Sequence, residues 1–179
     1  SITSSNLDEF FMVRVASLKD MVNAEYEKKD IAGMTPLEQL GEINKKTHEF
    51  VSQQYHTYNR TLLPALKSEM LNMIRHHEEL TEEQQKFVDK FFMENVYPVV
   101  TPMAVDSSRP FPLIRNKSLN IGALLSKKGQ EAELEFATVQ VPSVLARIVR
   151  IPAGNDGNQT VILLEEVIER NISRLFLNY

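Results

Sequence analysis

A cluster of four prolines separates two kinds of hydrophobic pattern, and this change of pattern limits the possible folds more than any other feature. Pro98, Pro102, Pro110 and Pro112 follow one another closely, and proline is unfavourable inside helices and central strands. Before the cluster, apolar residues recur three and four positions apart, as in helices; after it, they alternate with polar residues, as in strands. The sequence therefore predicts an α+β protein. We expect an antiparallel helical domain over residues 1–103 and a partial α/β domain with a mostly antiparallel sheet over residues 104–179.

The first helix is expected over residues 6–26, where apolar side chains recur at helical spacing. Three residues before its first turn have side chains that can cap a helix N-terminus: Ser4, Ser5 and Asn6. Asp8 and Glu9 follow, where acidic side chains favour the helix dipole. We therefore place a helix start at this point.

Two further helix starts carry the pattern of a capping box. Residues 35–38 read Thr-Pro-Leu-Glu and residues 81–84 read Thr-Glu-Glu-Gln, so each Thr can cap a helix with the acid or amide three positions later. Pro64 is expected to kink or end the helix that begins near residue 35, leaving a remnant up to about residue 72.

The second half of the chain predicts short strands followed by one helix. Alternating or β-branched apolar segments indicate strands over residues 119–125, 133–141, 148–151 and 160–163. Helical spacing returns from Leu164 to Phe176.

Composition excludes several classes of protein. The 179 residues include no cysteine, which excludes a disulfide scaffold, a cysteine zinc site and a thiol nucleophile. Six glycines form neither a phosphate-binding loop nor a dinucleotide fingerprint. The net charge is −4, and neither half is basic enough to predict a nucleic-acid partner. No apolar run reaches the roughly 20 residues of a transmembrane span. Because the sequence does not begin with Met, we expect a piece of a longer chain.

Arg14 stands out because it lies on the apolar stripe of the first predicted helix. A cation there needs an anionic partner or a path to solvent. Asn6 lies eight residues earlier, about 12 Å along a helix axis, and its amide both donates and accepts hydrogen bonds. Together these residues suggest part of a phosphate or nucleotide pocket. The alternative is a helix cap and an internally paired arginine.

A second group of basic residues lies in and just after the proline-rich segment: Arg109, Arg115 and Lys117. Guanidinium groups match the geometry of phosphate, although basic side chains in a loop are commonly just solvated. The four histidines, His48, His56, His76 and His77, have no spacing that favours a shared metal ion.

Four segments resemble bacterial polyphosphate kinase of the histidine-phosphorylated type, in the family's order. Residues 4–14 (SSNLDEFFMVR) resemble the signature near the start of that family, and residues 109–120 (RPFPLIRNKSLN) resemble the opening of its head domain. Residues 136–142 (FATVQVP) and 161–168 (VILLEEVI) also match. The resemblance covers nearly the whole chain.

The resemblance implies an enzyme that reversibly transfers the terminal phosphate of ATP to polyphosphate, with magnesium and a phosphohistidine intermediate. The chain would hold the helical N-terminal domain, without its first segment, and a truncated head domain. None of its four histidines matches the family's catalytic histidine motif, so no catalytic residue is assigned here. The magnesium ligands are likewise expected elsewhere, and this piece alone is expected to be inactive.

The resemblance also implies roles for particular residues. The Asn of the family signature contacts ATP, which assigns this role to Asn6; Arg14 lies in the same signature with no assigned role. Arg109, Arg115 and Lys117 are expected to face either the polyphosphate path or a dimer contact made by the head domain. Many family members have His where Arg109 stands, which weakens the argument that a positive charge is required at this position.

The expected partners are ATP or ADP, polyphosphate and further copies of the chain. The expected location is the cytoplasm, with peripheral membrane association left open. Two other functions compete with this interpretation: a non-catalytic helical module for interaction and oligomerisation, without a role in ATP binding, and a helical regulator unrelated to phosphate.

Overall fold

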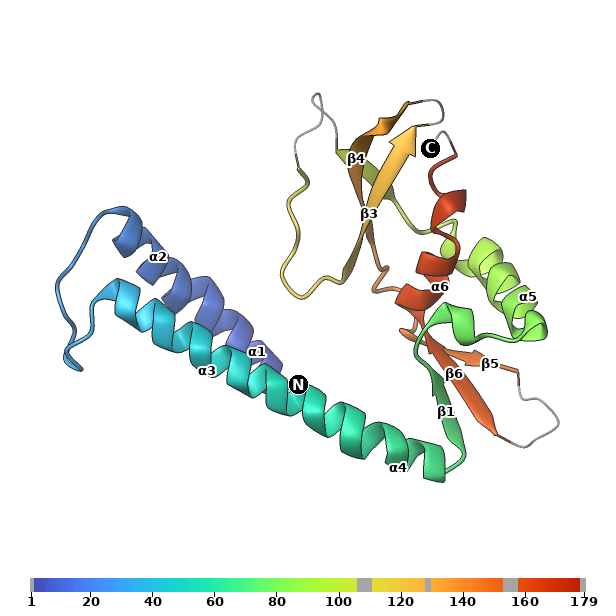
Figure 1. Ribbon diagram of the computed structural model, residues 1–179, viewed down its shortest axis with the longest axis horizontal. Coiled ribbons are helices and arrows are strands. Elements are labelled where there is room, and N and C mark those ends of the chain that lie inside the picture. Colours follow the sequence, from blue (N-terminus) through green and yellow to red (C-terminus); the bar gives the residue numbers. More distant parts are fainter. Residues whose placement is uncertain (1, 106–110, 128–129, 153–157, 178–179) are drawn as a thin grey trace. The chain divides into compact units, whose positions relative to one another are not determined.

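The computed structural model describes residues 2–105, 111–127, 130–152 and 158–177, which form two compact units. Unit 1 comprises Ser1–Pro64 and unit 2 comprises Ala65–Tyr179. Figure 1 shows a helical hairpin in unit 1 and two small sheets with their helices in unit 2. The prediction of a helical region followed by mostly antiparallel sheet is confirmed. No helix in the described part of the chain is both long and apolar enough to cross a membrane.

The division between the units lies about forty residues earlier than the boundary expected from the sequence at 103/104. Strand β1 (Leu71–Ile74) pairs in parallel with β6 (Gln159–Leu163), which belongs to the second half of the chain. The helix α5 (Glu82–Phe91) contributes Val88 to the same hydrophobic core as β6. These long-range contacts join residues 65–103 to the sheets, although their hydrophobic pattern is largely helical.

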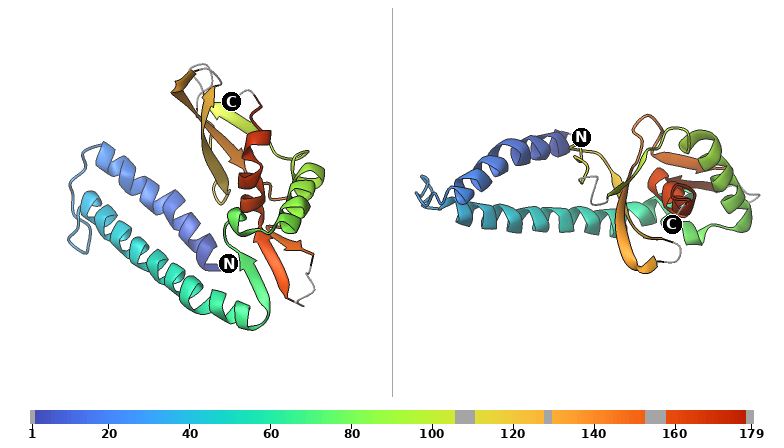
Figure 2. Two further views of the ribbon diagram at one scale, coloured as in Figure 1. Left: turned by 45° about the vertical axis from the view of Figure 1, so that its right-hand side comes forward. Right: turned by 90° about the horizontal axis from the view of Figure 1, so that it is seen from above.

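Unit 1 is an antiparallel pair of helical arms (Figure 2). The first arm comprises α1 (Ile2–Phe10), the π-helical turn η1 (Phe11–Val15) and α2 (Ala16–Asn23). The second comprises α3 (Pro36–Thr57) and the π-helical turn η2 (Tyr58–Leu62), followed by α4 (Leu63–Ser68), which begins at the end of unit 1. The expected capping box of α3 is present, with Thr35 Oγ1 accepting from the Glu38 N–H.

One local prediction for unit 1 is wrong: Ser4, Ser5 and Asn6 are not helix caps, because α1 already includes them. Of the two outcomes expected at Pro64, the helix does not end there, since Pro64 is the second residue of α4. In the preceding turn the Leu63 N–H donates to the Tyr58 carbonyl, five residues back, and this wider turn accommodates a residue that has no N–H of its own. The helical remnant ends at Ser68, and residues 71–74 form a strand instead of continuing the helix to residue 72.

Unit 2 contains two three-stranded sheets. The first has the order β1-β6-β5, in which β5 (Ile148–Ile151) pairs antiparallel to β6. The second has the order β2-β4-β3 and is antiparallel throughout: β2 (Pro102–Val105), β3 (Asn120–Lys127) and β4 (Gln130–Gln140). Strand β2 lies in the proline-rich segment, where the hydrophobic pattern predicted no regular element.

The helices of unit 2 complete one hydrophobic core with both sheets. They are the 3₁₀ turn η3 (His77–Glu79), α5, the π-helical turn η4 (Phe92–Val96), α6 (Leu164–Arg170) and the 3₁₀ turn η5 (Ile172–Arg174). Phe92, Val139, Ile162 and Ile168 are fully buried in this core. His76 and His77 follow β1 and enter η3.

An ion pair joins α5 to α6. Arg170 donates from Nε to Asp89 Oδ1 at 2.8 Å and from Nη2 to Oδ2 at 3.1 Å. Burial favours the neutral carboxyl, but the hydrogen bonds and the charge of Arg170 outweigh it and hold the pKa of Asp89 below its usual value. A carboxyl group whose pKa is lower in the folded state than in the unfolded state stabilises the fold at pH values above its unfolded-state pKa. This contribution disappears as the pH falls through the folded-state pKa.

We therefore expect unit 2 to lose roughly 1–2 kcal/mol of stability through Asp89 between pH 7 and pH 3. Urea unfolding at both pH values should show a smaller pH dependence in Asp89→Asn than in the original chain. Asp20→Asn changes an exposed carboxyl of α2 and serves as the control. An equal pH dependence in the original chain and Asp89→Asn would contradict this assignment.

Candidate functional site

The family-like segment of unit 1 places Asn6 on the surface of α1, where its side chain is exposed. Asn6 lies inside the helix, so its backbone N–H does not offer the anion site of a helix start. What remains available is the side-chain amide, which both donates and accepts hydrogen bonds. This chemistry suits the edge of a nucleobase or a sugar better than a phosphate.

Arg14 is held by the other arm of unit 1. Its Nη2 donates to Gln39 Oε1 at 2.9 Å, and Gln39 Nε2 donates in turn to the Met34 carbonyl at 3.3 Å. Gln39 is buried, so this chain of hydrogen bonds links η1 to the start of α3. Arg14 is therefore paired within unit 1, and this internal pairing is the alternative that the sequence left beside a nucleotide contact. The described hydrogen bond of Arg14 runs to α3 and not to Asn6.

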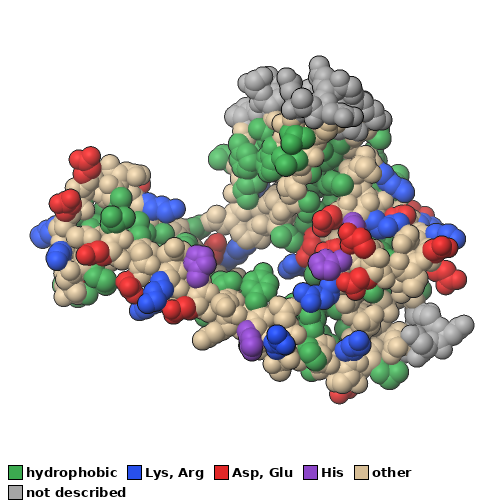
Figure 3. All heavy atoms as spheres, in the orientation of Figure 1, with side chains coloured by type: hydrophobic (Ala, Val, Ile, Leu, Met, Phe, Trp, Pro, Cys, Tyr) green, Lys and Arg blue, Asp and Glu red, His purple; other side chains and the backbone are tan. Residues whose placement is uncertain are grey.

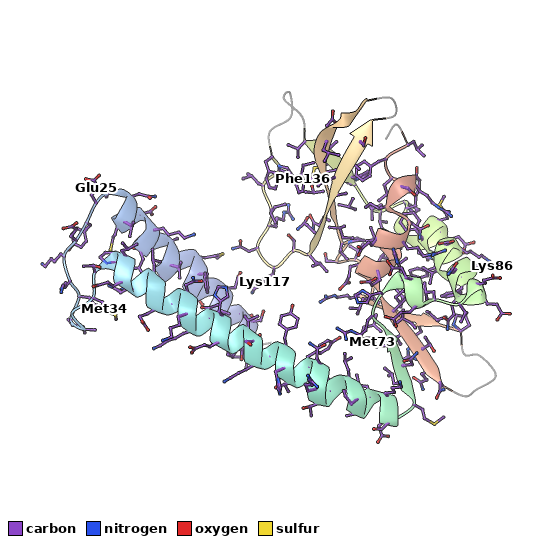
Figure 4. The ribbon with its side chains drawn as sticks, in the orientation of Figure 1. Glu25, Met34, Met73, Lys86, Lys117 and Phe136 are labelled. Carbon is purple, nitrogen blue, oxygen red and sulfur yellow. The ribbon has the colours of Figure 1, made fainter. Side chains whose placement is uncertain are left out.

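Of the three basic residues expected near the proline-rich segment, Arg115 and Lys117 are described and Arg109 lies outside the described residues. Residues 115–118 form a turn in which the Ser118 N–H and Oγ both donate to the Arg115 carbonyl, at 3.2 and 2.6 Å. Lys117 has a left-handed backbone with a φ of 59°, a conformation that favours glycine or asparagine. Figure 4 labels Lys117 on the loop that leads into β3.

Arg115 and Lys117 line a pocket of about 390 Å³ in unit 2. The segment after β4 and Arg147 also line it. The Val141 N–H donates to the Leu119 carbonyl at 2.8 Å, and the Leu164 N–H donates to the Arg147 carbonyl at 2.8 Å. These backbone hydrogen bonds fix the walls of the pocket.

Arg147 also lines this pocket, although the sequence analysis did not single it out. Its guanidinium donates from Nη2 to Glu165 Oε1 at 2.6 Å and from Nε to both carboxylate oxygens. Nothing near residue 147 indicates a site, because the pairing of β5 with β6 is what brings this part of the chain beside the loop of Arg115.

The outer face of the β2-β4-β3 sheet exposes apolar side chains. Leu124 and Leu134 are 68% and 61% exposed, and Phe111 lies on Phe136 with ring centroids 5.7 Å apart. Figure 3 shows hydrophobic side chains gathered over this part of unit 2, and Figure 4 labels Phe136 among them. The Oγ1 of buried Thr138, on the same face, has no hydrogen-bond partner. A monomer surface of this kind favours contact with another protein surface.

The described residues offer no ready site for a divalent metal. No group of three or more His, Asp or Glu side chains is close enough within this part of the chain to hold one. The half-buried acid Glu166 accepts instead from the His77 N–H at 3.0 Å. Burial raises the pKa of the Glu166 carboxyl, and its contacts are those of a structural acid.

Two family models match the chain. The polyphosphate kinase N-terminal domain matches residues 1–74, and the polyphosphate kinase middle domain matches residues 83–179. A polyphosphate kinase of Lactiplantibacillus plantarum is 48% identical over 99% of this chain and 24% of its own length. One of Halalkalibacterium halodurans is 44% identical over the whole chain and 25% of its own length. The chain therefore spans about a quarter of the length of these relatives.

The fold also matches a solved structure. The crystal structure of polyphosphate kinase from Porphyromonas gingivalis superposes with a TM-score of 0.76 at 24% sequence identity, covering 99% of this chain and 26% of that one. At this identity the match supports the fold. The match to the N-terminal domain ends at residue 74, and the match to the middle domain begins at residue 83.

Proposed function

Because the chain belongs to the polyphosphate kinase family, we propose that it serves as the nucleotide-contacting, non-catalytic part of an enzyme that transfers the terminal phosphate of ATP reversibly to polyphosphate. The observation that carries this proposal is the match of both family domains in order along the chain. The exposed amide of Asn6, within the family-like signature, supplies the nucleotide contact.

In this function Asn6 recognises a neutral part of ATP. An amide that donates and accepts at once can pair with the edge of adenine or with a ribose hydroxyl. Its place on α1 supports this role, because a helix holds the side chain more rigidly than a loop would. Arg14 acts through Gln39 and keeps the two arms of unit 1 together.

The chemical step belongs to parts of the family's chain outside these 179 residues. Phosphoryl transfer depends mainly on positioning and charge neutralisation. Magnesium would neutralise phosphate charge, but the described residues do not fit a metal site, so its ligands and the phosphorylated histidine are proposed to lie elsewhere. None of His48, His56, His76 and His77 is assigned as the nucleophile.

The basic residues of unit 2 are proposed to serve either the polyphosphate path or a contact between copies of the chain. Arg115 and Lys117 line a pocket, which supports the first role; Arg109 belongs with them by sequence. The exposed apolar face of the β2-β4-β3 sheet supports the second, a homo-oligomer formed through the head domain. The proposed setting is the cytoplasm, with peripheral attachment to a membrane left open.

A second candidate function is an interaction and oligomerisation module with no role in ATP binding. The observation that favours it is the same apolar face, on which Leu124 and Leu134 are more than half exposed. The two functions differ in what they predict for Asn6.

Asn6→Ala in the full-length enzyme is expected to raise the KM for ATP by roughly 5–30-fold with a small change in kcat. This corresponds to the loss of about 1–2 kcal/mol from neutral hydrogen bonds. Steady-state kinetics at saturating polyphosphate measure it. Asn44→Ala removes another exposed amide, from α3, and should leave the KM unchanged. Equal KM values for Asn6→Ala and the original enzyme would favour the interaction module.

A further inference from the structure

We propose that Gln39 is a positioning residue, which fixes the rotation and the register of the first arm of unit 1 and thereby the place at which Asn6 meets ATP. This role rests on the proposed function, in which Asn6 is the nucleotide contact. Gln39 itself touches no nucleotide in this role. It acts through Arg14, whose hydrogen bond to Gln39 joins the first arm to α3.

The side-chain amide of Gln39 is held at both ends. Its Nε2 donates to the Met34 carbonyl at 3.3 Å, and this carbonyl also accepts from the Asp30 N–H at 3.0 Å. Asp30 Oδ1 accepts in turn from the Met34 N–H at 3.0 Å, which closes the turn before α3, where Figure 4 labels Met34. The Oε1 that faces Arg14 is therefore fixed relative to α3, because turning the amide over would set its NH2 group against the guanidinium donors.

The apolar contacts between the two arms determine their register only weakly. Val15, Leu18 and Pro36 are buried, whereas Phe10 is 40% exposed. A pair of helices with so small an apolar contact can rotate or slide at little cost. A buried polar residue that must meet its partner then specifies the register, as a single buried polar residue does in coiled coils. Gln39 is such a residue, since its exposure is 9%.

Arg14 and Asn6 lie on the same continuous helical arm, so the hydrogen bond at one fixes the direction of the other. Residues eight apart in an uninterrupted α-helix point about 80° from each other. Here most of η1 lies between them, and its wider turn brings the two side chains closer to one face of the arm. A rotation that broke the Arg14 bond would turn Asn6 as well. A displacement of roughly 1 Å in a positioned group can change a rate up to about 10²-fold.

Gln39→Met keeps the length of the side chain and removes both hydrogen bonds. In the full-length enzyme we expect it to raise the KM for ATP about 5-fold and to change kcat less than about 2-fold, because the nucleotide contact moves while the chemical step lies elsewhere. Gln39→Glu keeps the acceptor for Arg14 and should restore the KM to within about 2-fold of the original value. Gln53→Met changes an exposed glutamine of α3 and is the matched control, with an unchanged KM.

A double-mutant cycle with Asn6→Ala separates positioning from a general loss of stability. In the Asn6→Ala background, Gln39→Met should raise the KM no further, because the contact that it positions is already lost. If Gln39→Met fails to fold, Arg14→Met breaks the same hydrogen bond at an exposed side chain, and the same outcomes apply.

Two results would overturn the role of Gln39 and leave the proposed function standing. The first is an equal rise of the KM in both backgrounds. The second is a KM that Gln39→Met leaves unchanged while Asn6→Ala raises it. A KM for ATP that Asn6→Ala leaves unchanged would overturn the proposed function and the role of Gln39 together.

Discussion

Phe92→Ala is expected to destabilise unit 2 by about 3–5 kcal/mol, the largest effect of any single substitution considered for this chain. The Phe92 side chain is fully buried at the start of η4 and lies in the core shared by both sheets. Its ring meets Tyr97 edge-on, with centroids 6.1 Å apart. Truncation of Phe92 removes this contact and leaves a cavity. The cavity persists because the π-helical turn that carries Phe92 is packed in the core and cannot move freely to fill it.

The expected change corresponds to a fall in the melting temperature of unit 2 of roughly 10–20 °C. Urea and thermal unfolding followed by circular dichroism measure both quantities. Met93→Ala is the matched control, since Met93 is the next residue of the same turn and is 43% exposed. It should change the stability by less than about 1 kcal/mol. A similar effect for the two variants would show that the core is not centred on Phe92.

Local signals in the sequence predicted the starts of α3, α5 and α6 and most of the strands. Thr35 and Thr81 form the expected capping boxes, because a capping box depends on residues only three positions apart. Strand β5 begins and ends where its apolar residues do, at Ile148 and Ile151. The residues that specify these elements therefore lie within the elements themselves.

The elements that depend on distant partners could not be predicted in the same way. Strands β1 and β2 are four residues long, and β1 exists because it pairs with β6, nearly ninety residues later. That pairing also places the division between units near Pro64 rather than in the proline-rich segment. The expected helix cap at Asn6 fails for a related reason, since helix propensity alone does not show that α1 already includes Ser4 and Ser5.

The candidate sites show the same contrast. Resemblance led to the proposal of Asn6, and local charge led to the proposal of Arg115 and Lys117. Arg147 was not singled out, because strand pairing brings it to the pocket that Arg115 and Lys117 line. The internal pairing of Arg14 with Gln39, 25 residues away, likewise depends on how the two arms of unit 1 pack.

The second large effect is a complete loss of chemistry when the chain is separated from the rest of its enzyme. We expect the purified 179-residue chain to incorporate no phosphate from ATP labelled at the terminal phosphate and to make no polyphosphate. The proposed function gives the reason: it assigns the phosphorylated histidine to a part of the enzyme outside these residues, and the described residues bring together no acidic or histidine cluster for a metal. Binding residues without a nucleophile position a nucleotide but do not cleave it.

A comparison of the full-length enzyme with the 179-residue chain, under the same conditions, tests the central claim most directly. Both are incubated with terminally labelled ATP and magnesium, and label is followed in protein and in polyphosphate. The proposed function predicts labelled protein and labelled polyphosphate with the full-length enzyme, and neither with the chain alone. Label retained on the purified chain, or no polyphosphate from the full-length enzyme, would contradict it.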